Sequence, residues 1–200
     1  MFHWLIPKSR RVSRKEDGLR PLAELTKKDC YFDAGDLQAR ISNLTIQLLY
    51  GLCDGNMAPL QPYVTPALYQ RLTRDARRYL DRQQRLNIVR PCVLRCEALG
   101  YKQIEDDIRI IFRVQTRMTR YVTNERREIV QGHRRNEIFE LKTWELCRSS
   151  SIKTEAPPEL DDTPCPSCGG PVNTYASAIC PRCGTAVRME RYEWIVSSIE

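Results

Sequence analysis

The sequence lacks the features on which membrane spans and most enzymes depend. No apolar run approaches the roughly 20 residues that a transmembrane helix needs. Histidine occurs only twice: His3 is near the N-terminus, and His133 stands alone between Gly132 and Arg134. There is no glycine-rich phosphate loop, nucleophile elbow or His-Glu-x-x-His motif. The sequence therefore favours a protein that is not an enzyme and has no transmembrane segment.

Cysteine usage also argues against a secreted protein held together by disulfides. The chain has nine cysteines, an odd number, and five of them are scattered: Cys30, Cys53, Cys92, Cys96 and Cys147. That usage is typical of a reducing compartment. The short apolar start precedes its basic residues, which is the reverse of a signal peptide. We expect a cytoplasmic protein, with the inner face of the cytoplasmic membrane as a further possible location.

The other four cysteines have the spacing of a zinc site. Two Cys-x-x-Cys pairs, Cys165 with Cys168 and Cys180 with Cys183, have 11 residues between them. Four thiolates at this spacing can converge on one tetrahedral metal ion. In each pair a proline follows the first cysteine and a glycine follows the second, which suits a tight turn. The pattern predicts one structural Zn²⁺ in a zinc ribbon; four free thiols or two disulfides are the alternative.

Residues 1–32 are predicted to form a basic N-terminal arm with an apolar tip. Apolar rings and chains followed by cations are typical of a segment that lies on an anionic membrane surface. The alternative is a frayed basic terminus, or a tip that packs on its own domain. The candidate membrane-contact residues are Phe2, Trp4, Leu5, Ile6, Lys8, Arg10 and Arg11.

Apolar residues at helical spacing predict two helices after the arm. The first begins near Asp36, with Asp33 or Asp36 as its cap, and ends at Asp54-Gly55-Asn56. Thr65 and Pro66 then suit the N-cap and first position of a second helix, which runs to about Gln84.

The second helix has a stripe of arginines on one side. These residues fall within about 80° at 100° per residue. With a formal net charge of +7, the stripe favours an anionic partner: a lipid surface, nucleic acid or an acidic protein. A solvated helix face, with Asp75 and Asp81 as local partners, is the alternative. The candidate anion-binding or partner-binding residues are Arg71, Arg74, Arg78, Arg82 and Arg85.

Beyond the helices, apolar residues recur at every second position, which is the pattern of a β-strand. Strands are predicted over about Ile88–Tyr101, Ile108–Met118 and Ile129–Arg148, with a bulge near Gly132. The fold class is therefore α+β: two N-terminal helices packed on a curved antiparallel sheet, followed by a small zinc ribbon. We expect an α+β domain over 33–150, a linker over 151–163, and a ribbon with a terminal strand over 164–200.

Several of these segments resemble the Tim-forty-four-like domain family, the C-terminal domain of the mitochondrial import-motor anchor. They are the first helix ending at Leu52-Cys53-Asp54, the helix that opens at Thr65, the alternating second strand, and the closing Trp144–Ser149 strand. The resemblance implies a cone-shaped fold akin to nuclear transport factor two. The Tyr192–Ile199 segment is similar to the end of the zinc ribbon that bacterial members of the family carry.

The resemblance implies a non-enzymatic scaffold that binds a protein partner and sits at the membrane periphery. The long helical region that recruits a chaperone in the mitochondrial protein is replaced by residues 1–32, so that role is not carried over. The zinc ribbon is a second surface for docking a partner. Two other functions remain open: a basic protein associated with nucleic acid or the ribosome, and a cone that binds a small molecule or houses an enzyme.

Overall fold

The computed structural model describes residues 17–154, 162–173, 180–185 and 194–200. Three α-helices and one 3₁₀ helix come first: α1 (Leu22–Lys28), α2 (Ala34–Asp54), η2 (Ala58–Tyr63) and α3 (Pro66–Leu80). The main sheet consists of β1 (Arg85–Ile104), β2 (Asp107–Thr123), β3 (Ile129–Ser149) and β6 (Ile195–Ile199). A separate two-stranded sheet is formed by β4 (Asp162–Pro164) and β5 (Pro171–Asn173).

The two predicted helices are α2 and α3, and their capping residues are as expected. The Asp33 carboxylate accepts a hydrogen bond from the amide of Gly35, and Gly55 ends α2 in the left-handed region. The Thr65 hydroxyl accepts from the Leu68 amide at the start of α3. Helix α3 ends at Leu80, earlier than the predicted Gln84, because the chain turns there toward β1 and Gln83 adopts a positive φ.

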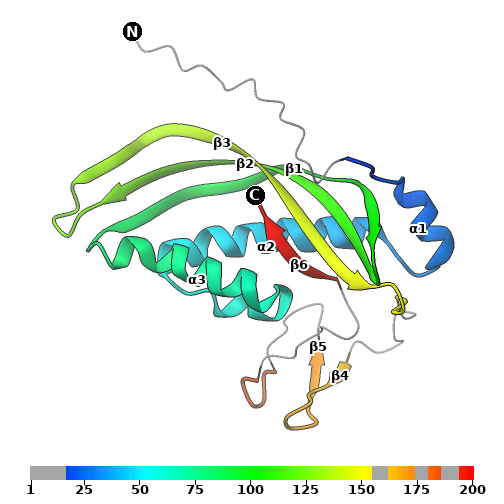
Figure 1. The fold of residues 1–200 in the computed structure, drawn as a ribbon. Helices are drawn as coiled ribbons and strands as arrows, with labels where there is room; N and C mark the ends of the chain where they lie inside the picture. Colours follow the sequence, from blue (N-terminus) through cyan, green and yellow to red (C-terminus); the bar gives the residue numbers. More distant parts are fainter. Residues whose placement is uncertain (1–16, 155–161, 174–179, 186–193) are drawn as a thin grey trace.

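The main sheet is antiparallel, with the strand order β1-β2-β3-β6. Its three long strands arch over α2 and α3, and the β2–β3 turn projects past the ends of both helices (Figure 1). Several irregularities in the β1–β2 register bend the sheet. The predicted bulge at Gly132 is confirmed: the residue has φ +79, and a Cβ there would lie 2.5 Å from the Arg120 carbonyl oxygen.

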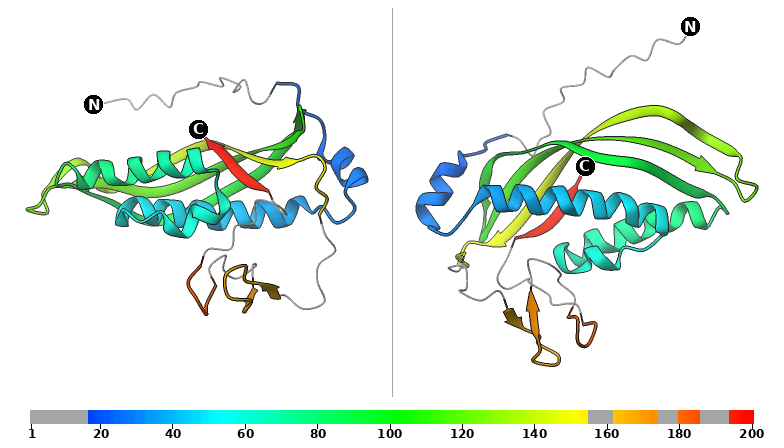
Figure 2. Two further views of the ribbon diagram at one scale, coloured as in Figure 1. Left: turned by 60° about the horizontal axis from the view of Figure 1, so that its bottom comes forward. Right: turned by 180° about the vertical axis from the view of Figure 1, so that it is seen from behind.

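The core lies between the sheet and the helices, as the two-residue period predicts. Ile110, Phe112 and Val114 of β2 point to the helical side and share one buried cluster with Ile41 and Leu44 of α2. Figure 2 shows α2 and α3 on the same side of the sheet. The predicted fold class, two helices packed on a curved antiparallel sheet, is confirmed.

The segment before α2 differs from the free arm that we expected up to residue 32. Leu25 of α1 and Phe32 are buried in the main core, and Arg20 exchanges backbone hydrogen bonds with Tyr101 of β1. Sequence periodicity missed α1 because it has only 7 residues, too few to display a helical pattern. From residue 17 to 32, the described part of the expected arm is integral to the α+β domain.

The terminal strand that we expected to belong to the ribbon lies in the main sheet instead. β6 pairs with Trp144–Cys147 of β3, and the Thr65 amide donates to the Val196 carbonyl oxygen. Trp194, just before β6, packs edge-on against Phe32 with ring centroids 5.9 Å apart. The physical reason is burial, since the domain core offers Trp194 and Val196 far more apolar contact than a small ribbon can. The four cysteines therefore lie in a segment bracketed by two strands of one sheet.

Among the helices of the described residues, none combines the length and apolar character needed to cross a membrane.

Candidate metal centre and cationic surface

The two Cys-x-x-Cys pairs form matching turns. In the first turn the Gly169 amide donates to the Cys165 carbonyl oxygen at 2.8 Å, and in the second the Gly184 amide donates to that of Cys180 at 2.9 Å. Gly169 and Gly184 have φ values of +68 and +70. The glycine after each pair is thus needed because a residue with a Cβ is strained in this conformation.

The four sulfur atoms meet at one point, as the spacing predicts. All four Sγ atoms of Cys165, Cys168, Cys180 and Cys183 lie within 4.8 Å of one another. Two of the Sγ–Sγ distances, Cys165–Cys183 and Cys168–Cys180, are 3.6 Å. Tetrahedral Zn²⁺ with Zn–S bonds of about 2.3 Å requires neighbouring sulfurs about 3.8 Å apart. The residues therefore fit a closed four-thiolate metal site, in which the metal would have a structural role.

Hydrogen bonds shift the pKa values of two thiols of this cluster in opposite directions. The hydroxyl and amide of Thr185 lower the pKa of the Cys183 thiol to about 6. For Cys168 the Gly170 amide acts to lower the pKa, but hydrogen bonds with the neighbouring thiols, together with burial, raise it to about 12. A metal cation would replace these shared protons, because thiolates, and not thiols, are the ligands of zinc.

The ribbon has its own small core. Cys165, Val172 and Cys180 are buried together, with Cys168 packed against them, in a cluster separate from that of the α+β domain. The β4–β5 pair lies apart from the main sheet, below the helical layer in Figure 1. Three buried residues, two of them cysteines, cannot supply much apolar stabilisation, so the metal would contribute most of the folding free energy here.

The arginine stripe divides into two groups. Arg74, Arg78 and Arg82 are exposed, and no hydrogen bond or ion pair joins their side chains to any other described residue. The local acidic partners considered above, Asp75 and Asp81, form no ion pair with them. These three arginines, with Arg77, line a shallow depression along α3 and the turn that follows it.

The other two predicted arginines lie at the ends of the stripe. Arg71 is half-buried and donates from Nη2 to the Ile199 carbonyl oxygen at 2.7 Å, so it attaches α3 to β6. Arg85 is exposed at the first position of β1. Arg71 is thus part of the domain's internal packing, whereas the exposed arginines are available to a partner.

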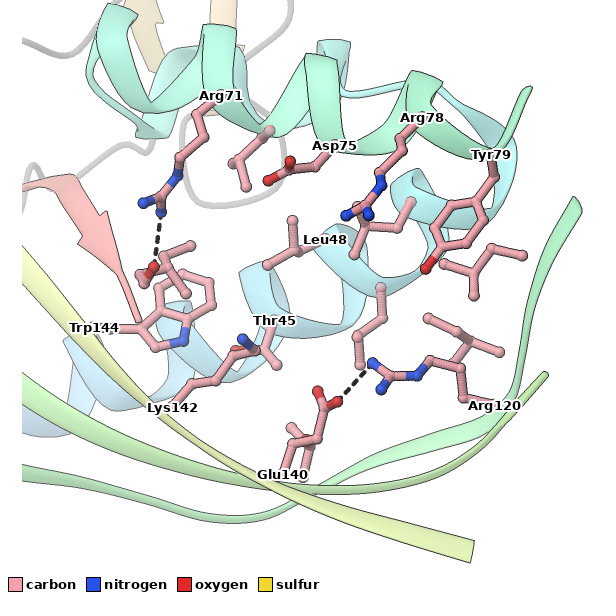
Figure 3. Close-up of a pocket in the computed structure, with 17 residues that line it drawn as sticks. Thr45, Leu48, Arg71, Asp75, Arg78, Tyr79, Arg120, Glu140, Lys142 and Trp144 are labelled. Carbon is pink, nitrogen blue, oxygen red and sulfur yellow. Dashed lines mark hydrogen bonds and ion pairs between the residues drawn. The ribbon is translucent and has the colours of Figure 1, made fainter. Parts of the chain in front are cut away.

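The sequence left open a cone that binds a small molecule, but it did not indicate which residues would line it. The structure has a cavity of about 500 Å³ between the helices and the sheet. Its floor is apolar, with Leu48, Leu72 and Ile88 among the lining residues. Figure 3 shows charged side chains from α3 and the sheet around it. The charged lining residues are Arg71, Asp75, Arg78, Arg120, Glu140 and Lys142.

Some of these charges are neutralised within the cavity wall and others are not. Arg120 and Glu140 form an ion pair at 2.6 Å. Arg78 and Lys142 have no such partner among the residues that the structure describes. The indole Nε1 of Trp144 is buried in the wall without a hydrogen-bond acceptor. The sequence held one signal of this site: Glu140 and Lys142 are polar at positions of β3 that face the helices.

The predicted membrane-contact residues, from Phe2 to Arg11, lie outside the described residues. Of the five scattered cysteines, Cys30 is exposed, and the other four, Cys53, Cys92, Cys96 and Cys147, are half-buried. Burial raises the pKa values of the Cys53, Cys96 and Cys147 thiols, so none of these is an activated nucleophile.

A four-stranded antiparallel sheet, helices along one face and a cavity between them define an α+β cone domain, here with a four-cysteine unit placed between its third and fourth strands. A sequence model described as the Tim44-like domain matches residues 20–158, which is more than half of the chain. The chain therefore belongs to the Tim44-like domain family, which comprises non-catalytic scaffold domains. A comparison with curated proteins found no match.

Proposed function

We propose that this protein is a non-enzymatic scaffold that binds an anionic membrane surface, at the inner face of the cytoplasmic membrane, and docks a protein partner there. The observation that carries the proposal is the group of exposed arginines that have no ion-pair partner in the described parts of the chain, Arg74, Arg78 and Arg82. Unpaired surface cations bind anionic lipid at a gain of about 1 kcal/mol each. The apolar tip at Phe2, Trp4, Leu5 and Ile6 would add insertion, which salt does not screen.

In this proposal the α+β domain spans residues 17–154 together with 194–200, and the zinc ribbon is an insertion. One structural Zn²⁺ held by the four cysteines would keep the ribbon folded as a docking surface for the protein partner. The observation in support is the convergence of the four sulfurs between two strands of one sheet.

The test is co-sedimentation of the full chain with phosphatidylserine-containing vesicles over a salt series. The double variant Arg74→Glu/Arg78→Glu should bind at least about tenfold more weakly, as expected for four charge units lost near the surface. The matched control is Arg134→Glu/Arg135→Glu, which changes the net charge equally at exposed positions on β3. Equal losses in both double variants would mean that net charge, and not the α3 surface, determines binding.

A chain that starts at Asp17 tests the apolar tip while leaving α1 in place. Salt-resistant binding that requires residues 1–16 supports the membrane scaffold. Binding that is indifferent to those residues, abolished by salt and displaced by RNA would instead support the nucleic-acid or ribosome-associated function.

The cavity favours a second candidate function, the binding of a small amphipathic anion. An apolar floor, two unpaired cations and a buried indole N–H without an acceptor suit a ligand with an apolar body and a carboxylate or phosphate end. Displacement of a fluorescent fatty acid by unlabelled laurate would detect it. Lys142→Met should weaken that binding, while the exposed Arg135→Met should not; no saturable binding would exclude this candidate.

A further inference from the structure

One edge of the main sheet is only partly covered. β6 lies beside β3 but pairs with no residue beyond Trp144–Cys147, and the last backbone pair on this edge joins Thr143 to Glu200. The amide of each donates to the carbonyl oxygen of the other at 2.9 Å. Beyond Thr143 no described residue pairs with this edge of β3.

The direction of the free backbone groups follows from this last pair. Thr143 directs both its N–H and its C=O toward β6, away from β2. The β2–β3 register is unbroken from Asp107↔Ser149 to Thr119↔Glu137. Because backbone groups alternate with a period of two, Leu141, Phe139 and Glu137 also direct their N–H and C=O groups outward. Three successive donor and acceptor pairs on this edge thus lack a backbone partner among the residues that the structure describes.

The same residues carry the most exposed large apolar side chains of the described chain. Phe139 is 61% exposed and Leu141 is 64% exposed. They lie opposite Arg117 and Gln115 of β2, on the face of the sheet away from the helices. Free backbone groups and adjacent exposed apolar side chains on one edge are what a strand-accepting site requires.

The charge of this edge determines which kind of strand it accepts. Its two acidic residues are already engaged, Glu137 with Arg117 at 3.8 Å and Glu140 with Arg120 at 2.6 Å. At either end, Arg135 and Lys142 have no acidic partner among the described side chains. The uncompensated charge beside the open edge is therefore positive.

We propose that β3 residues 137–141 accept an extended, acidic segment of a partner protein as an added strand in line with β6. Its alternate apolar side chains would pack beside Phe139 and Leu141, and its acidic side chains would lie on the other face, near Lys142. This site deepens the proposed scaffold role by naming one docking surface. It does not involve the α3 arginines or the ribbon.

The probe is an acetylated and amidated seven-residue peptide in which three valines alternate with four glutamates. With the full zinc-loaded chain, amide exchange should slow at Glu137, Phe139 and Leu141 by about tenfold when the peptide is at ten times its Kd, since protection scales as 1 + [L]/Kd. The amides of Ile138, Glu140 and Lys142 should not change, because they already donate to β2. Slowing at all six positions, or at none up to millimolar peptide, would overturn the proposal.

Backbone methylation of the peptide separates strand addition from simple charge attraction. The valine amides would face β3, so methylating them should abolish binding, whereas methylating the glutamate amides should leave it intact. When only three of the four glutamate amides are methylated, the two peptides have the same charge and composition. Equal binding of both would contradict an added strand.

Two variants of the protein complete the test. Leu141→Pro removes an outward N–H without touching the ladder to β2, which an edge strand tolerates. Phe139→Ser removes the apolar contact if the proline variant fails to fold. Either change should raise the Kd of the peptide by about tenfold or more. Leu94→Ser, at an exposed apolar position on β1, should leave the Kd unchanged. The same amides should also be followed without peptide at several protein concentrations. If their exchange slows as the protein concentration rises, a second copy of the chain occupies the edge, and the proposal of an acidic partner is wrong.

Because no vesicle is present, failure here would leave the membrane proposal standing, and the Arg74→Glu/Arg78→Glu variant should bind the peptide normally. If the native chain fails to bind vesicles but still binds the peptide, the membrane proposal is wrong and the strand-accepting site stands.

Discussion

Arg148 of β3 and Asp29, just after α1, form a buried ion pair with an Nη2–Oδ2 distance of 2.5 Å. Both side chains are 1% exposed. The Asp29 carboxylate also accepts from the amide and hydroxyl of Thr154, and the Arg148 guanidinium lies 4.4 Å from the centre of the Trp194 ring. The pair therefore joins α1, the segment that leaves β3 and the segment that returns to β6.

Asp29→Asn should destabilise the α+β domain by about 3 kcal/mol, because it leaves the Arg148 charge buried without a counter-ion. Urea unfolding followed by far-UV circular dichroism measures this. The double variant Asp29→Leu/Arg148→Met removes both charges and should be less destabilised than the single variant. A single variant as stable as the native chain would show that water reaches Arg148.

The same pair predicts a loss of stability in acid. Burial raises the pKa of Asp29, but the hydrogen bonds from Arg148 and Thr154, with the Arg148 charge, outweigh it and hold the pKa below its ordinary value of 3.8. The unfolded chain thus binds this proton more readily than the folded chain does. The stabilisation is complete above pH 3.8 and is lost as the pH falls through the lower, folded value. Consequently, the stability difference between the native chain and Asp29→Asn should be constant at neutral pH and shrink below about pH 4.

Metal removal should unfold the ribbon without opening the main sheet. The β6 contacts are with β3, α3 and the domain core, none of which depends on the four cysteines. Addition of a chelator should release one Zn²⁺ per chain and abolish amide protection over 162–173 and 180–185, while Val196 and Ile199 stay protected. Cys165→Ser/Cys168→Ser should reproduce this pattern. Loss of protection at β6 would show that the ribbon and the sheet fold as one unit.

Arg71→Met should lower the free energy of unfolding by about 2 kcal/mol, because it removes a charged donor and leaves the Ile199 carbonyl oxygen without its partner. Arg74→Met, one turn along the same helix and exposed, should change it by less than about 0.5 kcal/mol. Urea unfolding of the two variants gives the comparison. Equal small effects would mean that β6 does not depend on α3 for its position.

The parts that the sequence predicted were those with local signals. Asp33, Gly55 and Thr65 marked helix ends through capping chemistry, and the alternation around Phe112 identified the strand that contributes most to the core. The four cysteines identified the candidate metal site because their convergence follows from their spacing alone. In each case the residues that form the signal lie close together in the sequence.

The parts that the sequence did not predict depend on long-range contacts. Asp29 and Arg148 are distant in sequence, and neither residue alone indicates a buried pair. The sequence indicated that Trp194 needs a buried environment, but it did not predict that Phe32 and Arg148 form that environment. The residues that line the cavity escaped prediction because its wall combines α2, α3 and the sheet, and only the polar residues Glu140 and Lys142 on an inward face hinted at them.

The position of the cysteines between β3 and β6 also sets an order of events during synthesis. Both cysteine turns leave the ribosome before β6 does, so the metal site can form while the sheet still has three strands. Until β6 arrives, the whole outer edge of β3 is open. A nascent chain would therefore pass through a stage in which its four-cysteine unit is complete and its α+β domain is not.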